Sequence, residues 1–147
     1  MEIGARGGPF YFLPKLASKD SVRLKVVKFL PAIIWFIISL VLFTIPPPKL
    51  PDEEIFKIPH QDKIIHSIIF FLLVYLFCRP FKVIEMPKAK VASWFLSIAL
   101  YGLVYGISVE FIQKYFVSNR SYEIWDIVAD AIGCLIGYLY CSKYFIK

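Results

Sequence analysis

The sequence lacks the short motifs by which many soluble enzymes are recognised. It contains no glycine-rich phosphate loop, no Walker pattern, no nucleophile elbow and no internal repeat. The N-terminus has no short apolar core followed by a small-residue cleavage site, so we expect it to stay attached. None of the common phosphate-binding or nucleophile signatures therefore assigns a function.

Cysteine is also scarce, with only three residues in the chain. Cys78, Cys134 and Cys141 all fall in or at the ends of apolar segments, and none has the CxxC or Cys/His spacing of a metal site. We interpret them as small core residues. The cysteines thus indicate no metal site of their own, and no cofactor is expected.

Apolar residues dominate what is present. Hydrophobic residues make up 59% of the chain and aromatic residues 18%, with a mean hydropathy of +0.66. A soluble domain of this size would not be so apolar. The net charge of +6 comes from basic residues that flank apolar segments instead of forming a basic face, so no nucleic-acid partner is expected. The composition predicts an all-α integral membrane protein.

Four apolar segments approach the length of about 20 residues that crosses a bilayer as a helix, and the second is short but adequate if its polar start lies at the interface. An N-terminal arm, residues 1–25, precedes the predicted transmembrane domain, residues 26–147. Pro31 lies in the first turns of the first span, where backbone N–H groups have no helical partner. We predict a bundle of about four transmembrane helices, with spans at 26–45, 62–77, 91–111 and 124–140.

The basic residues predict the orientation of this bundle. The N-terminal side of the first span, the 79–90 turn and the C-terminus hold 12 of the 17 Lys and Arg residues. Cytoplasmic loops carry the excess of such residues. We therefore expect both termini in the cytoplasm.

Two small-xxx-small patterns occur in the last two spans. They run from Gly102 to Gly106 and from Gly133 to Gly137. Such spacing lets helix backbones approach closely in lipid. We interpret both as packing between the third and fourth spans, with self-association as the alternative.

Three of the helices carry a pair of polar residues one turn apart, each at the end predicted to face away from the cytoplasm. A charged side chain at the centre of a membrane helix costs about 2.5–3.5 kcal/mol on insertion scales, and less near the ends. The pairs should therefore turn toward each other around a cavity at the outer face. They are Asp62 with His66, Glu110 with Gln113, and Asp126 with Asp130, while Arg120 lies in the loop between the last two.

Each of these residues also has a purely structural interpretation. Asp130 is the hardest to explain in this way, because it lies a turn or more inside its span and must be paired, hydrated or protonated there. The structural alternatives are a helix cap for Asp62, a bond from His66 to a backbone carbonyl, an ion pair between Glu110 and Arg120, and stabilisation of a helix N-terminus by Glu123 and Asp126.

The polar pattern of spans two to four resembles the VanZ-like family of small bacterial membrane proteins. One position departs from that family, which usually has asparagine where Asp130 stands, so the resemblance carries over no role for a neutral amide there. The residues that carry the resemblance are Asp62, Lys63, His66, Glu110, Gln113, Arg120, Asp126, Ala129 and Gly133.

The resemblance implies a bacterial envelope protein of the cytoplasmic membrane, since founding members are associated with resistance to the glycopeptide teicoplanin. It implies no settled activity. Our leading hypothesis is that the cavity binds an anionic or sugar-bearing lipid or cell-wall precursor, in which cationic side chains contact phosphate or carboxylate. The predicted binding residues are Asp62, Lys63, His66, Glu110, Gln113, Arg120, Asp126 and Asp130.

Two other hypotheses remain open. In the first, the protein is a membrane-embedded hydrolase or transferase acting on a lipid-linked substrate, with His66 as general acid or base and Glu110 or Asp126 as its partner. The same histidine and carboxylates could also bind a divalent metal, although ligand geometry cannot be read from the sequence. In the second, the protein is an accessory subunit of a larger membrane complex, docked through the N-terminal arm.

Overall fold

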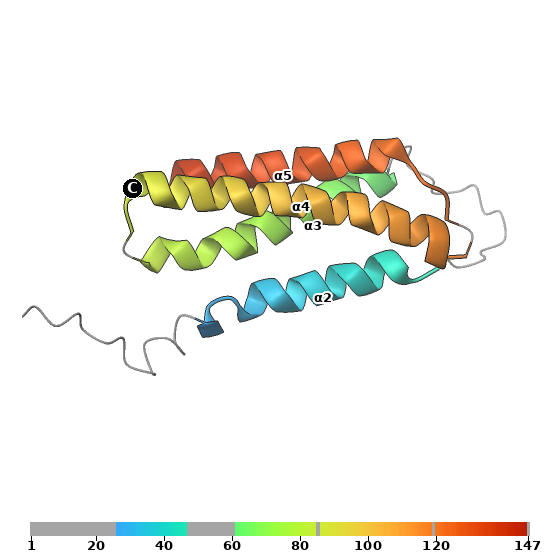
Figure 1. Ribbon diagram of the computed structural model, residues 1–147, viewed down its shortest axis with the longest axis horizontal. Helices are drawn as coiled ribbons and strands as arrows, with labels where there is room; N and C mark the ends of the chain where they lie inside the picture. Colours follow the sequence, from blue (N-terminus) through green and yellow to red (C-terminus); the bar gives the residue numbers. More distant parts are fainter. Residues whose placement is uncertain (1–25, 47–60, 85, 119, 147) are drawn as a thin grey trace, which may run out of the picture.

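The computed structural model describes residues 26–46, 61–84, 86–118 and 120–146. None of these residues forms a strand, and they fold into four helices: α2 (Leu30–Thr44), α3 (Gln61–Cys78), α4 (Lys88–Phe116) and α5 (Ile124–Phe145). A short 3₁₀ helix, η2 (Arg79–Val83), follows α3. Figure 1 shows the four helices running alternately from end to end. The N-terminal arm, to which we assigned docking, lies outside the described residues.

Three of these helices are long and apolar enough to cross a membrane. They are α3 with η2 (Gln61–Val83), α4 and α5. The fourth helix, α2, has 15 residues and so spans about 22 Å, which is short of a hydrocarbon core. Pro31 lies in its first turn, as the sequence predicts, and the preceding residues form a separate turn. The prediction of an all-α membrane bundle of four helices is confirmed.

The third span is longer than predicted at both ends. We expected residues 91–111, with the polar run from Glu110 ending the helix, whereas α4 continues to Phe116. The helix continues because Glu110 and Gln113 turn inward and are buried, while Lys114 lies on the exposed side. Polar residues therefore mark the inner face of this helix and not its end.

The glycine patterns join three helices closely. A Cβ added at Gly102 or Gly106 would meet side chains of α5, so this pattern packs α4 against α5 as predicted. The second pattern behaves differently: a Cβ at Gly133 would meet the backbone carbonyl of Ser67, and one at Gly137 would meet Val74, both on α3. The assignment of this second pattern to α4 was wrong, because it packs α5 against α3.

The shorter helix α2 is attached to α3 and α4 by hydrogen bonds from side chains. Trp35 Nε1 donates to the carbonyl of Ile69 at 3.1 Å, and Ser39 Oγ lies 3.0 Å from the hydroxyl of Tyr105. Hydrogen bonds between helices replace the hydrophobic effect, which does not favour helix association in lipid. These bonds position α2 over the face formed by α3 and α4.

The interior is apolar over most of the length of the bundle, and the three cysteines belong to it. Cys78, Cys134 and Cys141 are buried and free, as predicted. The outer surface is also apolar, with many isoleucines, leucines and valines exposed on every long helix. An apolar exterior around a packed interior is expected for a protein that faces lipid.

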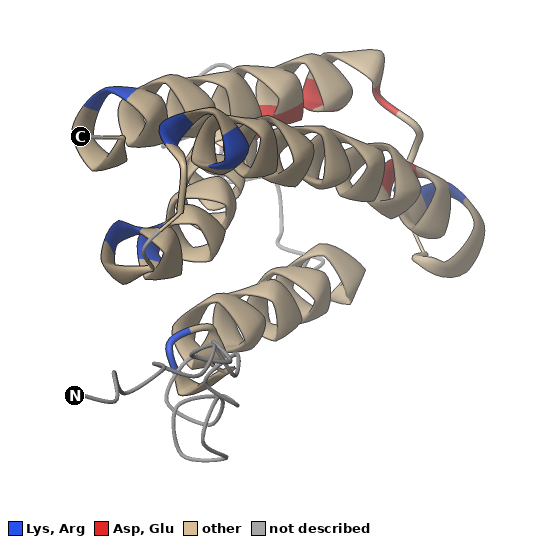
Figure 2. Cartoon of the chain, turned by 60° about the vertical axis from the view of Figure 1, so that its left-hand side comes forward, with Lys and Arg blue, Asp and Glu red and all other residues tan. Residues whose placement is uncertain are grey.

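Charges are divided between the two ends of the bundle (Figure 2). At one end lie Lys28 before α2, Arg79 and Lys82 in η2, the first lysines of α4 and Lys143 of α5. The acidic residues of α3, α4 and α5 lie toward the other end, where the chain also carries Lys63, Lys114 and Arg120. This second end contains all three predicted polar pairs and is the place to look for a site.

Candidate functional site

A lysine at the start of α3 joins three carboxylates from two helices and a loop. Lys63 Nζ lies 2.8 Å from Asp62 Oδ2, 3.0 Å from Glu123 Oε2 and 2.9 Å from Asp126 Oδ1. Asp62 lies in the first turn of α3, where a negative charge also complements the helix N-terminus. We call Lys63 with these three carboxylates the outer cluster.

Deeper in the bundle, a histidine and an aspartate form a buried pair. His66 Nδ1 lies 2.9 Å from Asp130 Oδ1, and the two side chains are 4% and 0% exposed. The alternative in which His66 donates to a backbone carbonyl is therefore wrong. Asp130 reaches the histidine because α4 has no side chain at Gly106, where a Cβ would lie 2.5 Å from Asp130 Oδ2.

Glu110 of α4 approaches the same histidine from the third helix. Its Oε2 accepts a hydrogen bond from the backbone N–H of Glu123 at 3.0 Å, whereas its Oε1 is buried and has no hydrogen-bond partner among the described residues. Glu110 is fully buried. We call His66, Glu110 and Asp126, together with Asp130, the inner cluster.

The expected ion pair between Glu110 and Arg120 is not formed within the described part of the chain. Arg120 lies in the loop before α5, is half-buried, and has a buried Nε with no hydrogen-bond partner among the described residues. Glu110 instead accepts a hydrogen bond from the backbone N–H of Glu123, because the loop before α5 folds back over the end of α4. The role of Arg120 in binding stays a prediction.

Asp126 connects the two clusters with its two carboxylate oxygens. Oδ1 accepts from Lys63, and Oδ2 lies 3.9 Å from His66 Nε2. The side chain is only 6% exposed. A single residue on the first turn of α5 thus divides the polar end into an outer part open to solvent and an inner part closed from it.

Helix α2 covers the inner cluster from the side. The Phe43 ring lies 4.7 Å from the His66 ring, centroid to centroid, and the Phe43 carbonyl accepts a hydrogen bond from Gln113 Nε2 at 3.1 Å. Gln113 therefore lies in the predicted region but binds the backbone of α2 instead of a carboxylate. An open cavity at this end stays a prediction, because residues 47–60, which connect α2 to α3 there, lie outside the described residues.

Among the described residues, two sets of side chains have the spacing of a metal site. One ligand atom from each of His66, Glu110 and Asp126 lies within 4.8 Å of the others, and all three residues are buried. Asp62, Glu123 and Asp126 form a second set with the same spacing, in which Lys63 already supplies a positive charge. The inner set has the nitrogen and oxygen donors from which divalent metals are bound.

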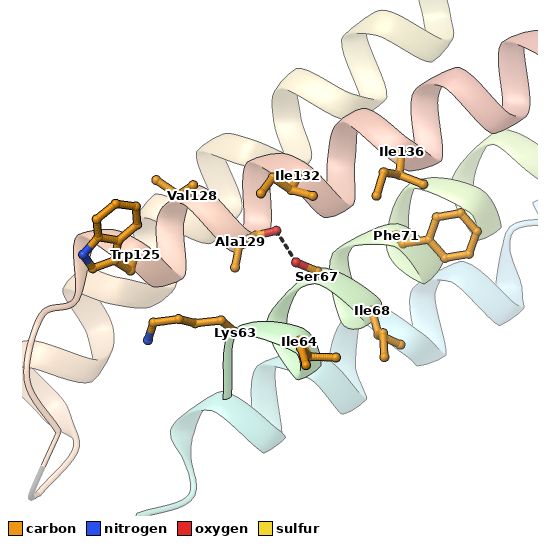
Figure 3. Close-up of a pocket in the computed structure, with 10 residues that line it drawn as sticks. All are labelled: Lys63, Ile64, Ser67, Ile68, Phe71, Trp125, Val128, Ala129, Ile132 and Ile136. Atoms are coloured by element: carbon orange, nitrogen blue, oxygen red, sulfur yellow. Dashed lines mark hydrogen bonds between the residues drawn. The ribbon is translucent and has the colours of Figure 1, made fainter. Parts of the chain in front are cut away.

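A groove of about 500 Å³ lies beside the polar end, between α3 and α5. Figure 3 shows its apolar walls, with Lys63 and Trp125 at one end and Phe71 and Ile136 at the other. Across its floor, Ser67 Oγ donates to the carbonyl of Ala129 at 2.8 Å. The groove runs along the exposed, apolar side of the two helices.

The sequence correctly indicated which residues gather at this end but not how they pair. Glu123 was assigned only to the helix N-terminus, yet it contacts both Lys63 and Glu110. Gly106 was assigned to helix packing alone, although it also admits Asp130. The i, i+4 spacing of Gly106 and Glu110 on α4 was the signal that both face the same neighbour.

Comparison with known proteins gives one family over nearly the whole chain. The VanZ/LLP1 family matches residues 9–146. A protein of fission yeast, Schizosaccharomyces pombe, the uncharacterized protein C11E3.10, is 32% identical over 92 residues, which are 63% of this chain and 49% of that protein. The chain thus spans about half the length of this curated relative. No solved structure matches. By the extent of the family match, this chain is a multi-pass membrane protein that belongs to the VanZ/LLP1 family.

Proposed function

We propose that this protein binds a lipid-linked molecule at the polar end of the bundle, with the apolar chain in the α3–α5 groove and the headgroup at the outer cluster. The observation that carries the proposal is the composition of the groove. Its walls are apolar, and its end holds the one lysine that joins the outer cluster. A lipid has the same division between chain and headgroup.

The charges at the end of the groove favour a headgroup that carries hydroxyls, such as a sugar. Lys63 is already bonded to three carboxylates, so an anionic headgroup has to compete with them for the ammonium group. Asp62 and Glu123 are about half exposed and can accept hydrogen bonds from hydroxyls. A phosphate in the same ligand would need Arg120, whose Nε has no hydrogen-bond partner among the described residues.

Trp125 supports placement of the headgroup at the membrane surface. It lies at the polar end of the groove and is 66% exposed. Tryptophan is enriched at the membrane–water interface, where its ring lies at headgroup level. We propose that this end faces away from the cytoplasm and that both termini are cytoplasmic, in the cytoplasmic membrane of a bacterium. A glycopeptide-resistance phenotype would follow if the bound molecule is a cell-wall precursor.

Native mass spectrometry of the full chain, purified in a mild detergent, tests this proposal. Ile132→Trp fills the groove, whereas Leu135→Trp adds the same ring to the exposed surface of the same helix outside the groove. We expect a co-purified lipid on the wild type and on Leu135→Trp, and its loss on Ile132→Trp. The mass of the bound species would distinguish a glycerolipid from a polyprenyl-linked sugar. Equal retention by both variants would contradict the proposal.

The His66–Asp130 pair favours a second candidate function, a hydrolase or transferase acting on the same lipid. A carboxylate on Nδ1 orients a histidine and leaves Nε2 for proton transfer. In this candidate the residue that orients His66 is Asp130, which lies one turn deeper on α5 than Asp126, whereas the sequence indicated Glu110 or Asp126 as the partner. Turnover of a lipid-linked sugar by the wild type that disappears in His66→Ala would support this candidate. Equal turnover by a folded His66→Ala would exclude it.

A further inference from the structure

The inner cluster brings three acidic side chains and one histidine together inside the bundle. Glu110, Asp126 and Asp130 are 0%, 4% and 0% exposed. Among the described residues, Lys63 is the only lysine or arginine paired with any of them, and it reaches only Asp126. Buried charges in proteins are paired or coordinate metals, because burying them unpaired costs several kcal/mol each, as an order of magnitude.

From this geometry we infer a binding site for a divalent transition-metal cation of the Zn²⁺ class, held by His66, Glu110 and Asp126. One ligand atom of each residue lies within 4.8 Å of the others. A nitrogen and two carboxylate oxygens are donors that Zn²⁺ accepts, and three protein ligands leave a fourth position for water or a ligand oxygen. The inference stands on these residues and does not depend on the lipid proposal.

The unpartnered oxygen of Glu110 is the independent sign of a ligand. Its Oε1 is buried with no hydrogen-bond partner among the described residues, although its Oε2 is used by the Glu123 backbone. A buried carboxylate oxygen without a donor is rare in folded proteins. Glu110 offers one of its oxygens to the same point as His66 and Asp126. A cation bound there through Oε1 would satisfy this oxygen.

The histidine is oriented in the way that metal-binding histidines are. Nδ1 is bonded to Asp130 at 2.9 Å, which leaves Nε2 directed toward Asp126 Oδ2 at 3.9 Å. Ligating histidines almost always donate their other ring N–H to a carboxylate or carbonyl. Two ligand atoms on one tetrahedral Zn²⁺ would lie about 3.4 Å apart, so small side-chain rotations would bring these atoms into place. Asp130 is thus a positioning residue.

The lysine of the outer cluster explains how the acidic residues of the outer and inner clusters can lie so close together. Asp62, Glu123 and Asp126 surround Lys63 Nζ, which serves as the cation of that group. Asp126 then gives one oxygen to the lysine and the other to the inner site. Its second oxygen is therefore held in a fixed position for the metal.

Zn²⁺ binding by the full chain in detergent, after removal of metal with EDTA, tests the inference. We expect one Zn²⁺ per chain by competition titration, and binding weakened at least about 10- to 100-fold in Glu110→Gln and in Asp130→Asn, the range found for outer-shell partners. Glu110→Gln keeps the shape of the side chain and an acceptor for the Glu123 N–H. Glu85→Gln, the same change in the chain segment between η2 and α4, is the matched control and should bind as the wild type does.

A spectroscopic measurement covers the case in which Glu110→Gln fails to fold. His66→Cys loaded with Co²⁺ should show a sulfur-to-cobalt charge-transfer band that the wild type lacks, because the new thiolate would be a direct ligand. Far-ultraviolet circular dichroism checks that each variant is folded. A wild type that binds no Zn²⁺, a folded Glu110→Gln that binds it equally well, or a His66→Cys without the band would each overturn the inference.

Discussion

Asp130 of α5 occupies the space that a side chain at position 106 of α4 would fill. A Cβ added at Gly106 would lie 2.5 Å from Asp130 Oδ2 and 3.0 Å from its Cβ. The carboxylate is fully buried there and is bonded to His66. The close approach of two helices and the placement of a buried acid therefore depend on the same glycine.

Gly106→Ala should destabilise the protein more than Gly102→Ala. The new methyl group at 106 meets a short, bonded carboxylate, whereas the one at 102 meets the sulfur of Cys134 at 2.9 Å, which can rotate away. We expect a loss of about 1–3 kcal/mol for Gly106→Ala, as for an overpacked core, and less for Gly102→Ala. Thermal unfolding in detergent measures both. In a double-mutant cycle with Asp130→Ala, the cost at 106 should fall, and purely additive effects would contradict this account.

The sequence predicted the membrane class, the number of helices and the end at which polar residues gather. These features depend on composition and on residues three or four apart, which a single chain displays directly. The sequence did not predict which helices pack together or which side chains bond to each other. A glycine pattern shows that a helix can approach another closely but not which one, so Gly133 and Gly137 were assigned to the wrong neighbour. The same limit explains why Asp130, which is hydrogen-bonded to His66, was not assigned as its partner.

Gly133→Ala should be the most damaging of the four glycine substitutions. A Cβ there would meet the backbone carbonyl of Ser67, which cannot rotate away as a side chain can. The helices α3 and α5 would have to separate, and the Ser67 to Ala129 hydrogen bond across them would lengthen or break. We expect little folded protein on size-exclusion chromatography. A variant that elutes and unfolds like the wild type would show that the helices do not pack this closely.

Lys63→Met should destabilise the polar end, because it leaves three carboxylates without their common cation. Breaking a fully buried ion pair costs about 3–5 kcal/mol, and we expect about 2 kcal/mol here because Lys63 is 21% exposed. Lys114→Met is the control, since Lys114 lies at the same end, lies over the rings of Tyr115 and Tyr122, and forms no ion pair among the described residues. Chemical denaturation in mixed micelles measures both. Equal stability of the two variants would mean that the outer cluster is not a stabilising unit.

Gln113→Leu should loosen α2 without unfolding the bundle. The substitution keeps the size of the side chain and removes the hydrogen bond from Nε2 to the carbonyl of Phe43. Hydrogen bonds between membrane helices contribute about 0.6–2 kcal/mol. Hydrogen exchange followed by mass spectrometry should therefore rise in peptides from 30–44 and stay unchanged in α5. Unchanged exchange in α2 would show that Trp35 and Ser39 hold it without Gln113.

The proposed orientation can be tested by labelling cysteines introduced at the two ends of the bundle. Ser118 and Lys82 are both exposed, and they lie beyond α4 at the acidic end and in η2 at the basic end. The native cysteines are buried, so background reaction with a membrane-impermeant maleimide should be low. Because basic loops stay in the cytoplasm, Ser118→Cys should label on intact cells and Lys82→Cys only after permeabilisation. The reverse pattern would place the polar end, and with it both proposed sites, on the cytoplasmic side.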